Sequence, residues 1–142
     1  MTTAFIVVGV DGSPTSLSAL RWAGKQAELT GATVQAITGW EYPHSYGGYP
    51  VAADVDWRVN AERILATAVE TAFGADNAKV SSTVVEGHPA RVLLDAAAGA
   101  ELLVVGNRGH GGFVEALLGS VTQHVIAHAT CPVLVVRQDP GP

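Results

Sequence analysis

The sequence predicts an α/β fold, a doubly wound parallel sheet of five strands with helices on both faces. Short apolar runs rich in β-branched residues, typical of buried parallel strands, alternate with segments whose apolar residues recur at helical spacing. Serine, aspartate and proline begin the helical segments, and glycine follows several of them. At 142 residues, with 48% hydrophobic and 15% charged residues, the chain suits one globular domain over residues 1–142.

The first strand is expected over Ala4–Val10, a continuous apolar run. Ser13 as N-cap and Pro14 at the first helical position begin a helix that Gly31 ends. Helical spacing predicts its buried side at Leu17, Leu20, Gly24 and Ala27. Because Gly24 has no side chain, it is expected to let this helix lie close to the sheet.

The second strand is expected over Thr33–Thr38, with Gly39 ending it. Residues Trp40–Asp54 then form a loop with three tyrosines, and loops of this length are usually functional or mobile. We expect a mobile cover over the second crossover, with a lid near a ligand as the alternative.

Asp54 or Asp56 caps the next helix, which is expected to run to Phe73. Its apolar stripe is predicted at Val55, Val59, Ile64, Leu65, Ala68, Val69 and Ala72. Val80–Val85 has the more polar pattern of an edge strand. This part of the chain therefore supplies one helix and one outer strand.

The last third of the chain is predicted to hold two helices and two strands. One helix begins with Pro89 at its first position and ends near Gly99. The fourth strand is expected over Leu102–Val105, the last helix over Ser120–Ala129 and the fifth strand over Val133–Arg137. Right-handed crossovers and an order of 3-2-1-4-5 would place strands one and four side by side, although composition alone does not fix that order.

The stretch after the fourth strand is rich in glycine. Gly106 and Gly109 follow the strand, and Gly119 and Ser120 precede the last helix, for which Ser120 is the expected N-cap. Glycine takes positive φ and lets a backbone approach a ligand closely. A buried strand, a glycine loop and a helix N-terminus together form an anion site, and phosphate is the expected anion.

Two common phosphate-binding motifs are absent from this stretch. Gly106-x4-Gly111 continues with Gly112, so the lysine of a P-loop is missing. The dinucleotide fingerprint also fails, because Gly109-x-Gly111 continues to Val114. Glycine turns can also link strands to helices without any ligand, so the motif alone leaves that alternative open.

The spacing G-x2-G-x9-G-S, from Gly106 to Ser120, resembles the nucleotide-binding signature of the universal stress protein family. The resemblance extends to Val7–Ser13, to Gly87–Ala90 and to Cys131–Val136, and so covers the whole chain. It implies the strand order 3-2-1-4-5, and it implies ATP, together with magnesium, as the cofactor.

With that order, a ligand should bind outside the carboxyl ends of strands one and four, where the strand order reverses. The loops that meet there are Gly9–Ser13 and Gly106–Gly112. The predicted nucleotide-binding residues are Gly9, Asp11, Gly39, Gly106, Arg108, Gly109, Gly119, Ser120 and Val121.

The roles of these residues follow from their chemistry. A phosphate would repel Asp11, so its better partner is a ribose hydroxyl or a metal; alternatively, it only helps Ser13 to cap the first helix. The resemblance implies that the backbone of Gly39 contacts the adenine edge. Gly106 and Gly109 would wrap the phosphates, with amide N–H groups from the start of the last helix. Arg108 either adds a charge-assisted bond or is solvated.

No catalytic or metal-binding residue is predicted. His124 and His128 lie four residues apart on one helix, but no acidic third ligand lies nearby, so they are expected to be solvated. His110 lies in the glycine stretch without an identifiable nucleophile as partner, and neither Ser13 nor Ser120 stands in a G-x-S-x-G elbow.

The totals limit the partners and the location. A net charge of −5 gives no reason to expect nucleic-acid binding. One cysteine, Cys131, excludes an internal disulfide framework, and its place before a buried strand predicts a small core residue. Because the sequence shows no basic leader and no apolar run of membrane-spanning length, a cytoplasmic protein without membrane contact is expected.

The resemblance implies an ATP-binding, stress-responsive regulator, and at most slow ATP hydrolysis is expected because no residue is placed to activate water. One alternative is a dimeric interaction module of the same fold that binds no nucleotide. A nucleotidyl-transferring enzyme would need a phosphate loop near the first strand, which Gly9–Ser13 does not provide. An apolar last strand, Val133–Arg137, at the sheet edge predicts a homodimer that pairs through this strand.

Overall fold

The computed structural model describes residues 3–42, 56–76, 79–108 and 118–137. Its strands form one parallel sheet in the order β3-β2-β1-β4-β5, which confirms the predicted fold class and strand order. The strands are β1 (Phe5–Gly9), β2 (Thr33–Trp40), β3 (Val80–Glu86), β4 (Leu102–Gly106) and β5 (Val133–Val136). The helices are α1 (Pro14–Thr30), α2 (Trp57–Phe73), α3 (Pro89–Ala96) and α4 (Ser120–His128).

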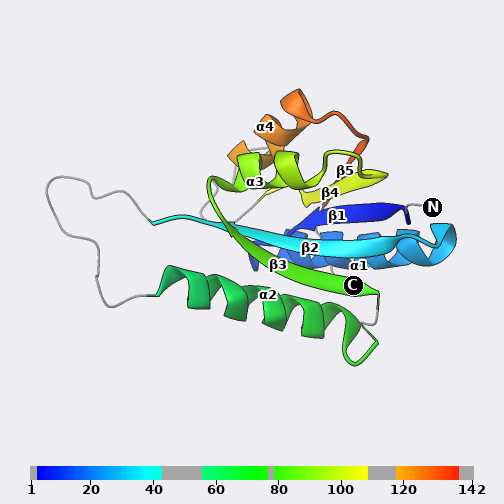
Figure 1. Cartoon of the computed structure of the whole chain (residues 1–142), viewed down its shortest axis with the longest axis horizontal. Helices are drawn as coiled ribbons and strands as arrows, with labels where there is room; N and C mark the ends of the chain where they lie inside the picture. The colour runs from blue at the N-terminus through cyan, green and yellow to red at the C-terminus, as the bar shows by residue number, and fades with distance from the viewer. Residues whose placement is uncertain (1–2, 43–55, 77–78, 109–117, 138–142) are drawn as a thin grey trace, which may run out of the picture.

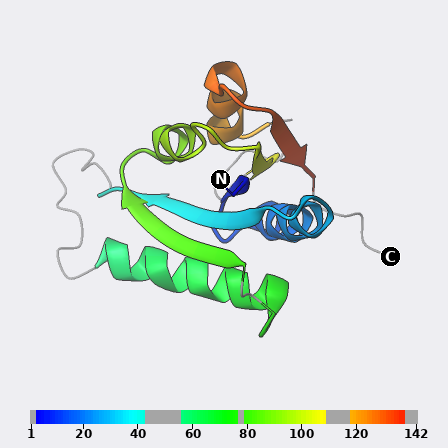
Figure 2. The same ribbon diagram turned by 45° about the vertical axis from the view of Figure 1, so that its right-hand side comes forward.

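The sheet lies between two layers of helices, with α1 and α2 on one face and α3 and α4 on the other (Figures 1 and 2). Each face has its own core because successive strand residues point to opposite sides. Ile6 and Val8 of β1 join the core under α1 and α2, whereas Val7 joins the core under α3 and α4.

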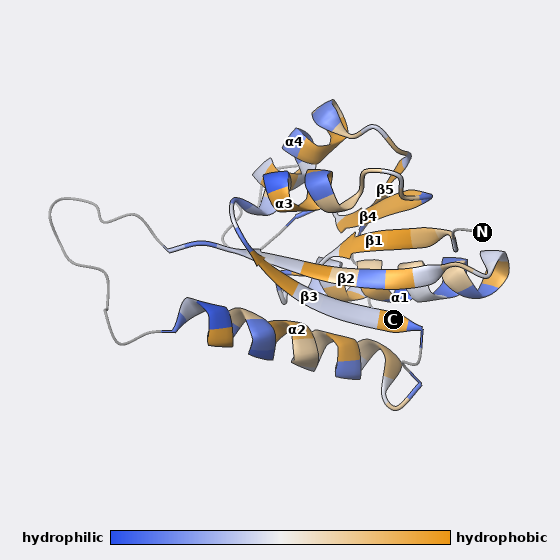
Figure 3. Ribbon diagram, in the orientation of Figure 1, coloured by the Kyte–Doolittle hydropathy of each residue, from blue (hydrophilic) through white to orange (hydrophobic). Residues whose placement is uncertain are grey.

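The central strand is β1, which pairs in parallel with β2 on one side and β4 on the other. Val8 lies beside Ala36 of β2 and beside Val104 of β4. Strands β1 and β4 are hydrophobic along their length, whereas the outer strand β3 is largely pale in Figure 3 and mostly exposed. This confirms the expected contrast between buried central strands and a more polar edge strand.

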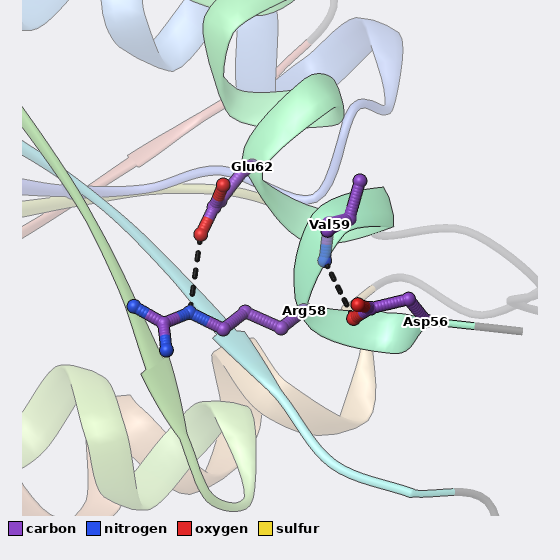
Figure 4. Close-up of polar contacts among 4 residues, drawn as sticks. All are labelled: Asp56, Arg58, Val59 and Glu62. Atoms are coloured by element: carbon purple, nitrogen blue, oxygen red, sulfur yellow. Dashed lines mark hydrogen bonds and ion pairs between the residues drawn. The ribbon is translucent and has the colours of Figure 1, made fainter.

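Three helices begin with a side-chain cap. The Ser13 hydroxyl accepts from the amide of Ser16 in α1, and the Asp56 carboxylate accepts from the amide of Val59 in α2 (Figure 4). The His88 imidazole caps α3. The predicted caps Ser13 and Asp56, and the predicted end of α1 at Gly31 with φ 81°, are therefore confirmed; Asp54 lies outside the described residues.

The prediction that Ser120 is the N-cap of the last helix was wrong. The helix begins at Ser120 itself, and Gly119 is the N-cap, with no side-chain cap hydrogen bond. Gly39 does not end the second strand, since β2 continues through it to Trp40. The ladder to β3 explains this extension, because it pairs Gly39 with Val85 and Trp40 with Glu86.

Two packing predictions were also wrong. A Cβ at Gly24 would lie 2.5 Å from the Phe73 ring, so this glycine makes room for α2 rather than for the sheet. Val59 is 54% exposed, because it lies in the first turn of α2, away from the buried stripe. That first turn is solvated, and its Arg58–Glu62 ion pair, 3.1 Å long, is exposed (Figure 4). Val55 and the expected mobile loop from 43 to 54 lie outside the described residues.

Candidate functional site

A cavity of about 360 Å³ opens at the carboxyl ends of β1, β2 and β4. This is the switch point of the sheet, because β2 lies on one side of β1 and β4 lies on its other side. The lining combines strand ends with the first turns of α3 and α4: Gly9, Val10, Asp11, Ser16, Ile37, Gly39, Pro89, Leu93, Val105, Gly106, Arg108, Gly119, Ser120, Val121 and Thr122. Every predicted site residue lines this cavity except Gly109, which lies outside the described residues.

The apolar part of the cavity depends on two glycines that let α3 approach the sheet. A Cβ at Gly9 would lie 2.7 Å from the Leu93 side chain, and one at Gly39 would lie 2.9 Å from the Pro89 Cα. Ile37, Pro89 and Leu93 thereby form one wall with the strand ends. The absent side chain at Gly39 is thus replaced by the backbone of α3, which lies directly against this position.

The polar part of the cavity is the start of α4. The amide of Gly119 donates to the Asn107 carbonyl at 2.7 Å, and the amide of Gln123 donates to the Gly119 carbonyl at 3.0 Å. The amides of Ser120, Val121 and Thr122 precede this first intrahelical bond, and Gly119 has no side chain to cap them. Together with the helix dipole they form a site with partial positive charge.

Two threonines hold the beginning of the glycine loop between α1 and α4. The Thr122 hydroxyl donates to the Gly106 carbonyl at 2.6 Å, and the Thr15 hydroxyl donates to the Arg108 carbonyl. A Cβ at Gly106 would lie 2.8 Å from the Thr15 Cβ and 2.9 Å from its backbone carbonyl carbon. Gly106 is therefore required by close packing against α1, and not by a positive φ.

Sequence reasoning missed Thr15 and Thr122. Both are buried, at 5% and 4% exposure. The available signal was their position in the first turn of a helix that follows a strand at the switch point. A hydroxyl at such a position can donate to the neighbouring loop.

Two roles were predicted for Asp11 as alternatives, a helix-capping role and a place in the ligand site, and its position in the structure fits both. One of its carboxylate oxygens accepts from the amide of Ser13 at 2.8 Å, so it supports the start of α1. The residue also lines the cavity and is exposed. Its carboxylate is therefore within the site, next to the end of β1.

The remaining candidate groups lie elsewhere. His124 and His128 are exposed on α4, and within the described residues no group of three or more His, Cys, Asp or Glu side chains could hold a metal ion. Cys131 packs against the core under α3 and α4, and burial raises the pKa of its thiol. No helix in the described part of the chain is long and apolar enough to cross a membrane.

The fold agrees with comparisons to known proteins. The model of the universal stress protein family matches residues 5–137, and the chain belongs to this family. A universal stress protein of Thermus aquaticus is 34% identical, over 93% of this chain and 97% of its own length. One from Mycobacterium tuberculosis is 36% identical over 94% of this chain but only 45% of its own, so the chain spans about half the length of such mycobacterial relatives.

A solved structure from the same family has the same fold. A universal stress protein in complex with cAMP is 30% identical to this chain and superposes with a TM-score of 0.72. The match covers 98% of this chain and all of the other.

Proposed function

We propose that the cavity binds an adenine nucleotide, with ATP as the main ligand, and that the protein acts as a stress-responsive regulator controlled by this ligand. The observation that carries the proposal is an apolar pocket next to an uncapped helix N-terminus, at the switch point of a parallel sheet. An apolar pocket suits a base, and uncapped helical amides suit phosphate.

The lining suggests how the nucleotide lies. The base packs between the strand ends and α3, near Gly39, where backbone groups can contact its edge. The phosphates accept from the amides of Ser120 and Val121, and Arg108 at the cavity adds positive charge. Gly109 lies outside the described residues, and its contact with the phosphates is proposed from the glycine spacing alone.

Asp11 is proposed to contact the ribose hydroxyls or a magnesium ion on the phosphates. Magnesium is usually held by one or two carboxylates together with substrate phosphates and water, and Asp11 is the one carboxylate among the described lining residues. One of its oxygens accepts from the Ser13 amide at 2.8 Å, which holds the carboxylate at the edge of the cavity.

A regulatory role is favoured over efficient catalysis. Asp11 and Arg108 are the charged residues among the described lining residues, and no histidine, cysteine or lysine side chain joins them there. Hydrolysis of ATP is therefore expected to be slow. The complex of the 30%-identical family member with cAMP supports an adenine nucleotide as the class of ligand.

Calorimetric titration with ATP, AMP and cAMP, with and without magnesium, tests this proposal. At a free ATP concentration of about a hundred times the dissociation constant, the free energy of unfolding should rise by roughly 2.7 kcal/mol. The nucleotide content of heat-released purified protein gives an independent measurement. No binding, no shift in melting temperature and no released nucleotide would instead support an interaction module that binds no nucleotide.

We also propose a homodimer that pairs through residues 133–137. β5 is one edge of the sheet, and its exposed backbone edge could pair with the same strand of a second copy. Leu134 and Val135 pack against opposite cores, so lysine at either position would weaken the fold as well as a dimer. Light scattering of the unmodified protein is the cleaner test, and a monomer mass at micromolar concentration would overturn the proposal.

A further inference from the structure

Three histidines gather on the surface where α3 meets α4. The ring centroids of His88 and His124 are 6.5 Å apart, and those of His124 and His128 are 4.5 Å apart in an edge-on arrangement. All three residues are exposed. We call these residues the histidine cluster.

His88 has a structural role that depends on its proton. It is the N-cap of α3, and its Nδ1 accepts from the amide of Ala90 at 3.2 Å. A nitrogen that accepts cannot carry a proton, so this cap exists only when Nδ1 is unprotonated. The preceding turn is fixed, since the amide of Gly87 donates to the Trp40 carbonyl at 2.7 Å. Protonation therefore removes the cap without an obvious substitute.

The helix that His88 caps forms the apolar wall of the cavity. Pro89 and Leu93, in the first turns of α3, both line it. The fit is tight, because a Cβ at Gly39 would lie 2.9 Å from the Pro89 Cα. A loosened first turn of α3 would thus disturb the wall on which the base is proposed to pack.

Titratable and charged groups lie around His88 on several elements. α4, which packs on α3, carries only His124 and His128 as titratable groups, and β1 and β2, which also pack on α3, carry none. On α3 itself, Arg91 and Asp95 face each other at 3.9 Å in an exposed ion pair. Glu86, at the end of β3, is the other nearby carboxylate in sequence. Protonated neighbours in the cluster would repel one another.

We propose that the histidine cluster makes nucleotide binding sensitive to acid: protonation of His88 uncaps α3, loosens the apolar wall and weakens the nucleotide complex. This inference rests on the proposed nucleotide-binding function. Histidine side chains change charge between about pH 5 and 8, so the effect falls in the range of mild acid stress. Binding is strongest when the cap is neutral and weakens as the pH falls.

The test compares ATP affinity at pH 7.5 and pH 5.5 in the unmodified protein and in His88→Asn. Asparagine is a good N-cap that does not titrate in this range. We expect the unmodified protein to lose about three- to tenfold in affinity between these pH values beyond the loss seen in His88→Asn, the fold-change that corresponds to one N-cap. The protonation of ATP itself is common to both proteins and cancels.

Two further variants sharpen the test. His88→Ala lacks the cap at every pH, so its affinity should already be reduced at pH 7.5. His124→Gln removes the neighbouring group that, once protonated, would repel a proton on His88, so it should increase the acid effect while leaving the affinity at pH 7.5 unchanged. Exchange of the Ala90 amide, followed by NMR without nucleotide, should accelerate at pH 5.5 in the unmodified protein relative to His88→Asn.

The outcomes separate the two proposals. Absence of ATP binding at both pH values would overturn the proposed function and this inference with it. Strong binding with the same pH dependence in the unmodified protein and in His88→Asn would overturn this inference alone.

Discussion

The starts of α1 and α4 differ although the two helices follow neighbouring parallel strands and face the same cavity. At α1, the Ser13 hydroxyl accepts from the Ser16 amide, Asp11 accepts from the Ser13 amide, and Pro14 has no amide proton to satisfy. At α4, the N-cap is Gly119, and no side chain caps the helix. One helix start has a side-chain cap from its own sequence, and the other has none.

Under the proposed function, the start of α1 is stabilised by its own side chains, whereas the start of α4 is open to a ligand. A side-chain cap stabilises a helix by about 1 kcal/mol relative to alanine and by roughly a few tenths of a kcal/mol relative to glycine, so the start at Gly119 is a small local loss of stability. Such a loss is expected where a ligand supplies the missing acceptor. The following predictions exchange or remove features of the two starts, from the largest expected effect on nucleotide affinity to the smallest.

Gly119→Asp gives α4 the kind of cap that α1 has. The backbone of Gly119 has φ −69° and ψ 161°, which any residue adopts, so the fold should persist. The new carboxylate would accept from the α4 amides, raise the stability of the apoprotein by roughly a few tenths of a kcal/mol and repel phosphate. We expect at least a hundredfold loss of ATP affinity by titration calorimetry. Unchanged affinity would show that phosphate does not bind at α4.

Gly106→Ala acts where the two helix starts meet. The added Cβ would lie 2.8 Å from the Thr15 Cβ and 2.9 Å from its carbonyl carbon, so α1 and β4 must move apart. We expect a loss of about 1–3 kcal/mol in the free energy of unfolding. Urea denaturation measures this loss, and ATP affinity should fall at the same time. A stability equal to that of the unmodified protein would mean that the close contact is easily relieved.

Thr15→Val and Thr122→Val compare how each helix holds the loop. Each variant keeps the shape of the side chain but loses the hydrogen bond to the Arg108 or the Gly106 carbonyl, and Thr15→Val also loses the contact with the Ser13 hydroxyl. Leaving a buried carbonyl unsatisfied costs about 1–3 kcal/mol. ATP affinity should fall severalfold in both, and more for Thr15, whose partner carbonyl belongs to a residue proposed to contact phosphate. Equal affinities in all three proteins would show that the hydroxyls do not position the loop.

Ser13→Ala is the matched control at α1. It removes the side-chain hydroxyl that caps α1, so the free energy of unfolding should fall by about 1 kcal/mol. Because the Ser16 amide does not belong to the phosphate site, ATP affinity should stay within about twofold of the unmodified protein. A large loss of affinity here would mean that both helix starts contribute to binding.

Much of the fold followed from local patterns. Alternation of apolar strands and amphipathic helices predicted the architecture, and Ser13, Pro14 and Gly31 marked α1 because capping depends on neighbouring residues. The errors at Gly39 and Ser120 arose where tertiary contacts decide: the ladder to β3 extends β2, and Gly119 caps α4 without a side chain.

The cavity could be predicted from the glycine spacing and the switch-point rule, yet its details could not. The hydrogen bond from Thr15 to Arg108 joins residues 93 positions apart in sequence, and no local pattern encodes it. The same holds for the contact that makes glycine necessary at Gly106. Sequence therefore located the site, whereas long-range packing defined the side chains that shape it.

The parallel pairing of β1 with β4 also sets an order of events during synthesis. Ile6 of β1 pairs with Leu102, so the central strand waits for a partner that is made roughly a hundred residues later. At about 5–20 residues per second this delay lasts roughly 5–20 seconds on the ribosome. The cavity needs both strands and the start of α4, so it cannot form before residue 122 has been made. Under the proposed function, nucleotide therefore cannot assist the first half of this chain as it folds.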